Sequence, residues 1–197
     1  MVPMQREAGE MALVEELKGI PGLKVKLSEP LARYTSIKIG GPADYILEVE
    51  SIAALSRALK ILDRDGVPLC ILGKGSNVLV SDLGVRGAVF RMGGEFKRME
   101  WQEGREEARV TVGAAYPVTQ LAREAVRRGY AGLEFAEGIP GSVGGVVFMN
   151  AGGRFGCVGD ALLDVTGLDM DGTPFRRVVA EGDMGYRKTI FDGALVT

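Results

Sequence analysis

Residues 43–72 read ADYILEVESIAALSRALKILDRDGVPLCIL. The first seven of these residues read as a strand, and Ser51 then offers a side chain that helix N-caps favour. The apolar residues that follow recur at the three- and four-residue spacing of one helix face, at Ile52, Leu55, Ala58, Leu59 and Leu62. Gly66 is expected to end this helix near Asp65, and residues 67–72 form a second, continuously apolar strand. This order favours parallel strands joined by a right-handed crossover.

The segments on either side add further helices and strands. Residues 8–19 predict a short helix that ends at Gly19, and Pro21 soon follows it. A second helix is predicted over residues 117–128, because Pro117 suits its first turn. Short strands are predicted at residues 87–92, 97–101, 108–113, 163–170 and 174–180, the last two joined by the hairpin signal Asp171-Gly172.

Together these elements predict an α+β fold with two lobes. We expect an N-terminal helix in residues 1–20, a first lobe over residues 21–80 and a second lobe over residues 81–197. Hydrophobic residues make up 46% of the 197 positions, so the chain can build a core without disulfides or metals.

Charge and hydropathy exclude several classes of partner. The formal net charge of −2 argues against nucleic acid, whose binding proteins are usually basic. No apolar run approaches the roughly 20 residues of a membrane span, and residues 1–10 lack the apolar segment of a signal peptide. We therefore expect a cytoplasmic protein with no nucleic-acid or membrane partner.

The supply of catalytic side chains is restricted. The chain has no histidine, which removes histidine-based triads and histidine metal sites. Its two cysteines, Cys70 and Cys157, belong to no C-x-x-C pattern, so we expect no metal site. Cys70 lies in an apolar run and is expected to be a buried structural residue. Proton chemistry must then use carboxylates, Lys, Tyr, Ser or Cys, unless a cofactor performs the difficult step.

Glycine is the one strong compositional deviation, with 29 of 197 residues, about twice the average usage of roughly 7%. A first glycine turn, defined here as residues 73–78 (Gly-Lys-Gly-Ser-Asn-Val), follows the second predicted strand. It does not match a P-loop, because Lys74 stands between the glycines, nor the dinucleotide fingerprint, because position 78 is Val. Its spacing leaves two interpretations open, an ordinary Gly/Asn turn or an anion-binding loop.

A second glycine turn, residues 138–145, reads Gly-Ile-Pro-Gly-Ser-Val-Gly-Gly. Four glycines in eight residues leave many backbone N–H groups free, and nests of such groups bind phosphate or carbonyl oxygens. A tight structural loop would explain the same residues. Both turns thus predict either a structural role or an oxygen-rich ligand.

The order and spacing of several motifs resemble the UDP-N-acetylenolpyruvoylglucosamine reductases, also called UDP-N-acetylmuramate dehydrogenases. The matching segments are residues 35–43, residues 73–80 with Asp82 and Gly84, the second glycine turn, residues 149–152 and residues 186–191. The resemblance implies an FAD-binding domain of the vanillyl-alcohol-oxidase-like (PCMH) type, with the flavin between two α+β lobes. It assigns cofactor binding to Gly73, Lys74, Gly75, Ser76, Asn77, Val78, Gly138, Ile139, Pro140, Gly141, Ser142, Gly144 and Gly145.

The resemblance also implies a reaction. NADPH would reduce FAD, which would reduce the enolpyruvyl ether of a UDP-sugar to UDP-N-acetylmuramate for peptidoglycan synthesis. Arg187 matches the family's catalytic arginine, whose guanidinium would stabilise charge that develops on the substrate carboxylate. Tyr186 is a weaker candidate that would pack beneath the site.

Two family features have no counterpart in these residues. The proton-donor serine lies in a Gly-Ser-x-Phe-Lys-Asn-Pro-like motif and a second catalytic group is a late glutamate, and neither motif is found before Thr197. The expectation is that a substrate-binding lobe belongs after residue 197. Two alternatives stay open, namely a different flavoprotein oxidase or dehydrogenase of this fold and an FAD-binding fragment without turnover.

Overall fold

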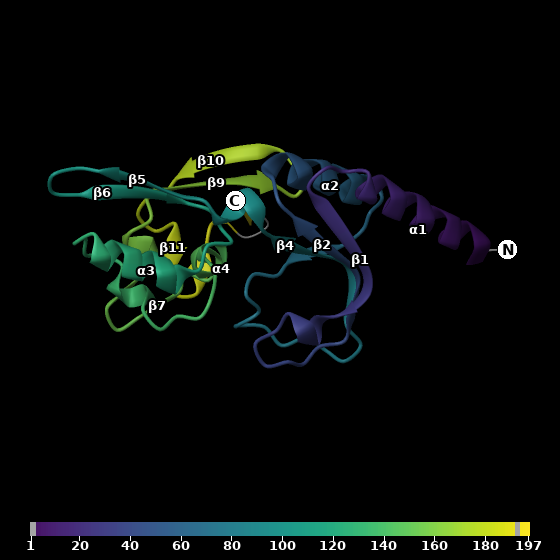
Figure 1. Cartoon of the computed structure of the whole chain (residues 1–197), viewed down its shortest axis with the longest axis horizontal. Helices are drawn as coiled ribbons and strands as arrows, with labels where there is room; N and C mark the ends of the chain where they lie inside the picture. Colours follow the sequence, from purple (N-terminus) through teal and green to yellow (C-terminus); the bar gives the residue numbers. More distant parts are fainter. Residues whose placement is uncertain (1–2, 192–193) are drawn as a thin grey trace.

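The computed structural model describes residues 3–191 and 194–197 and has two lobes (Figure 1). The first lobe is built from one four-stranded sheet and two α-helices. Its elements are α1 (Pro3–Lys18), β1 (Leu23–Pro30), η1 (Leu31–Arg33), β2 (Pro42–Val49), α2 (Ile52–Arg64), β3 (Leu69–Ile71) and β4 (Val85–Met92).

The second lobe has shorter strands and helices. Its first half contains η2 (Gly94–Lys97), β5 (Met99–Glu103), β6 (Ala108–Val112), α3 (Val118–Arg127), η3 (Glu134–Ala136), α4 (Val143–Phe148), β7 (Gly152–Gly153) and β8 (Gly156–Cys157). Its second half contains η4 (Val158–Asp160), β9 (Asp164–Asp169), β10 (Pro174–Val178), β11 (Met184–Gly185), β12 (Lys188–Thr189) and β13 (Ala194–Val196).

The strand–helix–strand prediction is confirmed, with one addition. The sheet order is β1-β2-β4-β3, and β4 is parallel to both β2 and β3, so the two predicted strands do point the same way. However, β4 lies between them. This strand begins at Val85, beyond the lobe boundary predicted near residue 81. We propose that the first lobe extends through β4, and the division into lobes stays a prediction.

Helix α2 covers one face of this sheet, as its apolar spacing predicts. The Ser51 hydroxyl accepts a hydrogen bond from the Ala54 N–H at 3.1 Å, which satisfies one free donor at the helix start. Leu55, Leu59 and Leu62 are fully buried in a core that includes α1, β2 and β4. Since side chains alternate along a strand, neighbouring residues such as Val89 point to the opposite face, where the apolar cluster is much smaller.

Strand β3 lies at the edge of the sheet, and this overturns the prediction for Cys70. The residue is exposed rather than buried. An apolar run indicates burial only where other elements cover both faces of the strand and both of its edges. Beyond β3 there is no further strand among the described residues.

The last strands of the second lobe contact the first lobe through a hydrogen bond and a shared buried core. The β9–β10 hairpin turns at Asp171-Gly172 as predicted, with Gly172 at a φ of +82°. The Ser56 hydroxyl of α2 donates a hydrogen bond to the Gly172 carbonyl at 2.9 Å. Leu168 of β9 and Leu195 of β13 belong to the same buried core as α2. Figure 1 shows the β9–β10 hairpin reaching over to α2.

Candidate functional site

The two glycine turns meet, although their contacting residues are 64 positions apart in the sequence. The Ser76 hydroxyl of the first turn donates a hydrogen bond to the Pro140 carbonyl of the second at 2.5 Å. At Gly73 a Cβ atom would lie only 2.6 Å from the Ser142 Oγ. The Ser142 hydroxyl would therefore have to rotate away to make room for a side chain at position 73.

The first turn rests on the segment that precedes β2. Gly75 has a φ of +67°, and a Cβ there would lie 2.1 Å from the Tyr34 carbonyl oxygen. The Ser36 N–H donates to the Gly75 carbonyl at 2.9 Å. Only glycine combines this left-handed conformation with so close a backbone approach. The motif at residues 35–43 thus supports the first turn.

The second turn is held by backbone hydrogen bonds to the strand-like segment before α3. The Gly144 N–H donates to the Ala114 carbonyl at 2.8 Å, and the Val143 N–H donates to the Tyr116 carbonyl at 2.9 Å. Ser142 is only 5% exposed and precedes α4, but its hydroxyl does not cap that helix. Its hydroxyl is therefore not committed to the helix that follows it.

A cavity of about 870 Å³ is bounded by both turns, a size typical of small-molecule sites. Within residues 3–191 and 194–197, the charged residues of its wall are all cations: Lys74, Arg91 and Lys97. Its polar wall otherwise includes Tyr116, Gln120 and Ser142, and its apolar wall includes Leu72, Phe148, Met170, Leu195 and Val196. The lining suits a ligand that is anionic at one part and apolar at another.

Cys70 also lines this cavity. The residue is exposed as a whole, but desolvation by the surrounding protein raises the pKa of its thiol. Because a thiolate is the reactive form of cysteine, a raised pKa keeps this group protonated at neutral pH. Cys70 therefore forms part of the wall as a thiol.

The predicted cofactor residues divide into two groups. Five lie on the cavity wall: Gly73, Lys74, Ser142, Gly144 and Gly145. The others lie in the same two turns but outside that wall: Gly75, Ser76, Asn77, Val78, Gly138, Ile139, Pro140 and Gly141. The turns that carry all of them are in contact, while their individual roles stay predictions.

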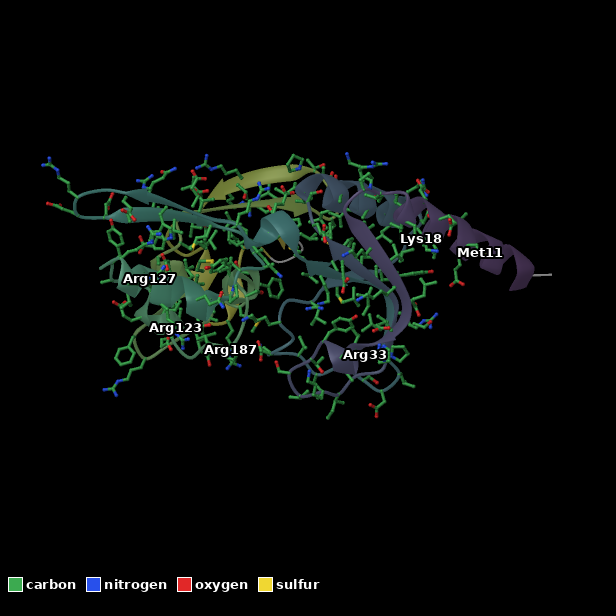
Figure 2. The ribbon with its side chains drawn as sticks, viewed as in Figure 1. Met11, Lys18, Arg33, Arg123, Arg127 and Arg187 are labelled. Carbon is green, nitrogen blue, oxygen red and sulfur yellow. The ribbon has the colours of Figure 1, made fainter. Side chains whose placement is uncertain are left out.

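Arg187 lies outside the cavity wall, at the tip of a hairpin. Strands β11 and β12 pair with Gly185 opposite Lys188, so Tyr186 and Arg187 form a two-residue loop. Arg187 has a φ of +51°, and its guanidinium lies 5.6 Å from the centre of the Tyr186 ring. Figure 2 shows Arg187 at the lower edge of the second lobe, level with Arg33 of the first lobe in that view.

Asn150 fixes this hairpin, a role that sequence reasoning missed. Its amide nitrogen donates to the Gly185 carbonyl at 2.8 Å, and its amide oxygen accepts from the Gly159 N–H at 3.0 Å. It does so at a φ of +40°, a region that asparagine tolerates better than most residues. The motif at residues 149–152 was a signal for this position, but not for its contact with the Arg187 hairpin.

We expect Asn150→Ala to lower the free energy of unfolding by about 2–4 kcal/mol. The variant loses both side-chain hydrogen bonds, and alanine is strained in the left-handed backbone conformation of this position. Urea unfolding measures this loss. Asn150→Gly separates the two causes, since it relieves the strain and should recover about 1 kcal/mol. Equal stability of the wild type and Asn150→Ala would show that these hydrogen bonds do not hold the hairpin.

Within residues 3–191 and 194–197, no three His, Cys, Asp or Glu side chains are grouped as around a metal ion. None of the helices in this part of the chain is long and apolar enough to cross a bilayer.

Known proteins resemble this chain in sequence. UDP-N-acetylenolpyruvoylglucosamine reductase 1 of Bacillus cereus is 41% identical over 178 residues, which cover 90% of this chain and 58% of the relative. UDP-N-acetylenolpyruvoylglucosamine reductase 2 of Symbiobacterium thermophilum is 42% identical over 184 residues, 92% of this chain and 58% of the relative. The chain thus spans less than two thirds of the length of these relatives.

Solved structures resemble it in fold. The UDP-N-acetylenolpyruvylglucosamine reductase of Thermus caldophilus matches with a TM-score of 0.70 and 38% identity, over 88% of this chain and 59% of that one. A protein named BBE-like 1, from Physcomitrella patens, shares the fold alone, with a TM-score of 0.66 and 18% identity over 93% of this chain and 42% of its own. The predicted α+β, vanillyl-alcohol-oxidase-like fold is therefore confirmed.

A family model described as an FAD binding domain matches residues 43–176. This range contains both glycine turns and most of the cavity wall between them. Since the match covers more than half of the chain, the chain belongs to the FAD binding domain family.

Proposed function

We propose that this chain holds FAD between its two glycine turns for the NADPH-dependent reduction of UDP-N-acetylenolpyruvoylglucosamine to UDP-N-acetylmuramate. The observation that carries the proposal is the contact of the two turns at one cavity whose charged wall residues are all cations. The names of the similar reductases supply the substrate. A role in peptidoglycan precursor synthesis and a cytoplasmic location belong to the same proposal.

The residues of the cavity fit FAD. A dinucleotide carries a negatively charged diphosphate, which Lys74, Arg91 and Lys97 attract without a competing carboxylate among the described residues of the wall. The missing side chain of Gly73 lets backbone approach a ligand closely. The apolar wall offers a surface for flat rings.

When bound, FAD supplies the hydride-transfer chemistry that no side chain of this chain provides. The chain's part is to bind and orient. The two turns present neutral backbone N–H groups, which can hold a diphosphate without a P-loop lysine. The Ser142 hydroxyl, buried and free of the helix cap, can donate to the same ligand.

Arg187 would act on the substrate rather than on the cofactor. Negative charge develops on the substrate carboxylate as the enolpyruvyl double bond is reduced, and a fixed guanidinium stabilises that charge more than the ground state. Asn150 holds the hairpin that carries Arg187. No residue of this chain is assigned as the proton donor.

A second candidate is an FAD-binding unit without turnover of its own. This candidate is favoured by the position of Arg187 outside the cavity wall. The two candidates share the cofactor and differ only in whether this chain alone converts the substrate.

The cofactor is tested by incubating the purified chain with FAD, removing free flavin and recording the visible spectrum. We expect retained flavin absorption bands. A colourless protein would contradict both candidates.

The reaction is tested with the chain alone and with the chain joined to the remaining C-terminal region of a similar reductase. NADPH should bleach the bound flavin, and the enolpyruvyl UDP-sugar should restore its colour while simple alcohols do not. Recolouring only in the joined protein would favour the binding unit. Bleaching of the oxidised flavin by a simple alcohol, without NADPH, would indicate a different flavoenzyme of this fold.

A further inference from the structure

Arg91 lies at the end of β4 and lines the cavity. It shares a sheet face with Val89, two residues earlier, and this is the face opposite α2. Its guanidinium lies over the Tyr34 ring, 4.5 Å from the ring centre. Stacking of this kind fixes the plane of an arginine and leaves the edges of its guanidinium free for hydrogen bonds.

The guanidinium has no acceptor among the residues that the structure describes. Its Nε is buried without a hydrogen-bond partner. Glu48 stands opposite Arg91 in the β2–β4 register, but its carboxylate is paired with Lys26 at 2.7 Å. The guanidinium therefore keeps donors that no described residue accepts from, and an anionic ligand at this wall can accept hydrogen bonds from them.

Arg91 is also placed beside the first glycine turn. The Tyr34 residue on which it stacks is the one whose carbonyl lies beneath Gly75. Tyr34 thus contacts both residues: its carbonyl lies against the backbone of Gly75, and its ring lies against the guanidinium of Arg91. Lys74, from the turn itself, is a second cation on the wall of the same cavity.

We propose that Arg91 is the charged donor for the diphosphate of the dinucleotide bound in this cavity. Its planar guanidinium can donate two parallel hydrogen bonds to two phosphate oxygens and carries a positive charge. The backbone N–H groups of the glycine turns are neutral and donate one hydrogen bond each. This assignment rests on the proposed function, because it takes FAD as the ligand. It adds an ionic contact from β4, which lies outside both glycine turns.

The test compares the binding of FAD and riboflavin, which lacks any phosphate, by quenching of flavin fluorescence. Arg91→Gln should weaken FAD binding about ten- to a hundredfold, as expected for a lost charged hydrogen bond. It should leave riboflavin binding unchanged and reduce the salt dependence of FAD binding. Arg91→Lys keeps the charge without the fork and should fall between the wild type and Arg91→Gln.

Arg86→Gln is the matched control. Arg86 lies on the same strand, is exposed, pairs with Asp44 at 2.9 Å and does not line this cavity. FAD binding should be unaffected by this change. If Arg91→Gln fails to fold, as shown by thermal melting, the comparison is made with Arg91→Lys.

Unchanged FAD binding in the Arg91 variants would overturn the assignment, and so would an equal loss of FAD and riboflavin, which indicates a structural role. Inorganic pyrophosphate, titrated by calorimetry, separates this inference from the proposed function. Wild-type chain that binds no FAD would contradict the proposed function. If the wild-type chain binds no FAD but binds pyrophosphate, loss of pyrophosphate binding in Arg91→Gln would still support the assignment of Arg91. Pyrophosphate binding that persists in Arg91→Gln would contradict the assignment, and so would a wild-type chain that binds no pyrophosphate.

Discussion

Arg187→Ala should leave FAD bound while slowing the reoxidation of the flavin by the enolpyruvyl UDP-sugar about 10²- to 10³-fold, the usual effect of removing one donor that stabilises transition-state charge. FAD should stay bound because Arg187 lies on a separate hairpin and not on the cavity wall. Rapid-mixing measurements on the joined protein resolve the two half-reactions. Reduction by NADPH should change little, because its transition state places no charge on the sugar carboxylate.

The chain offers a closely matched control in Arg154. Arg154 and Phe155 form the two-residue loop between β7 and β8, just as Tyr186 and Arg187 do between β11 and β12. The Arg154 guanidinium lies 5.9 Å from its neighbouring aromatic ring, close to the 5.6 Å of Arg187. Arg154→Ala should react like the wild type. Loss of FAD in Arg187→Ala, with normal turnover in the fraction that keeps it, would rule out the assigned role.

Gly75→Ala should both destabilise the chain and abolish FAD binding. The methyl group would lie 2.1 Å from the Tyr34 carbonyl oxygen, and the backbone has a φ of +67° that alanine adopts at a cost. The left-handed conformation costs about 1–2 kcal/mol, and the overlap adds about 1–3 kcal/mol. Because the obstacle is backbone, relief requires the first glycine turn to shift away from the Tyr34 segment on which it rests.

Gly66→Ala separates these two costs. Gly66 has nearly the same conformation, with a φ of +64°, but a Cβ there meets nothing within 4 Å. Urea unfolding should therefore show only the conformational cost in Gly66→Ala and a clearly larger loss in Gly75→Ala. FAD titration should show normal binding in Gly66→Ala alone. Similar stabilities for the two variants would mean that the turn accommodates the methyl group freely.

Local features were predictable from the sequence because short-range chemistry determines them. Ser51 caps α2 as expected, and Asp171-Gly172 turns the β9–β10 hairpin. The insertion of β4 between β2 and β3 was not predictable, because periodicity reports which residues are apolar but not which strands pair. The prediction that Cys70 is buried was wrong for the same reason, since only the pairing shows that β3 is an edge strand.

The candidate site follows the same division. The glycine turns were recognisable as possible ligand loops, because glycine spacing is a local signal. Their contact through Ser76 and Pro140 is not, since it joins residues 64 positions apart. Arg91 and Asn150 gain their proposed roles only from tertiary neighbours, Tyr34 in one case and the Arg187 hairpin in the other. Neither neighbour lies next to them in the sequence.

The burial of Leu168 and Leu195 beside α2 has a consequence for how the chain acquires its structure during synthesis. A core that begins with Leu13 in α1 is completed by a residue 182 positions later, so it must wait for nearly the whole chain. Contacts of such sequence separation slow folding, because a long loop must close before they form. The N-terminal half should therefore leave the ribosome with part of its apolar surface still open, and the two lobes should mature together.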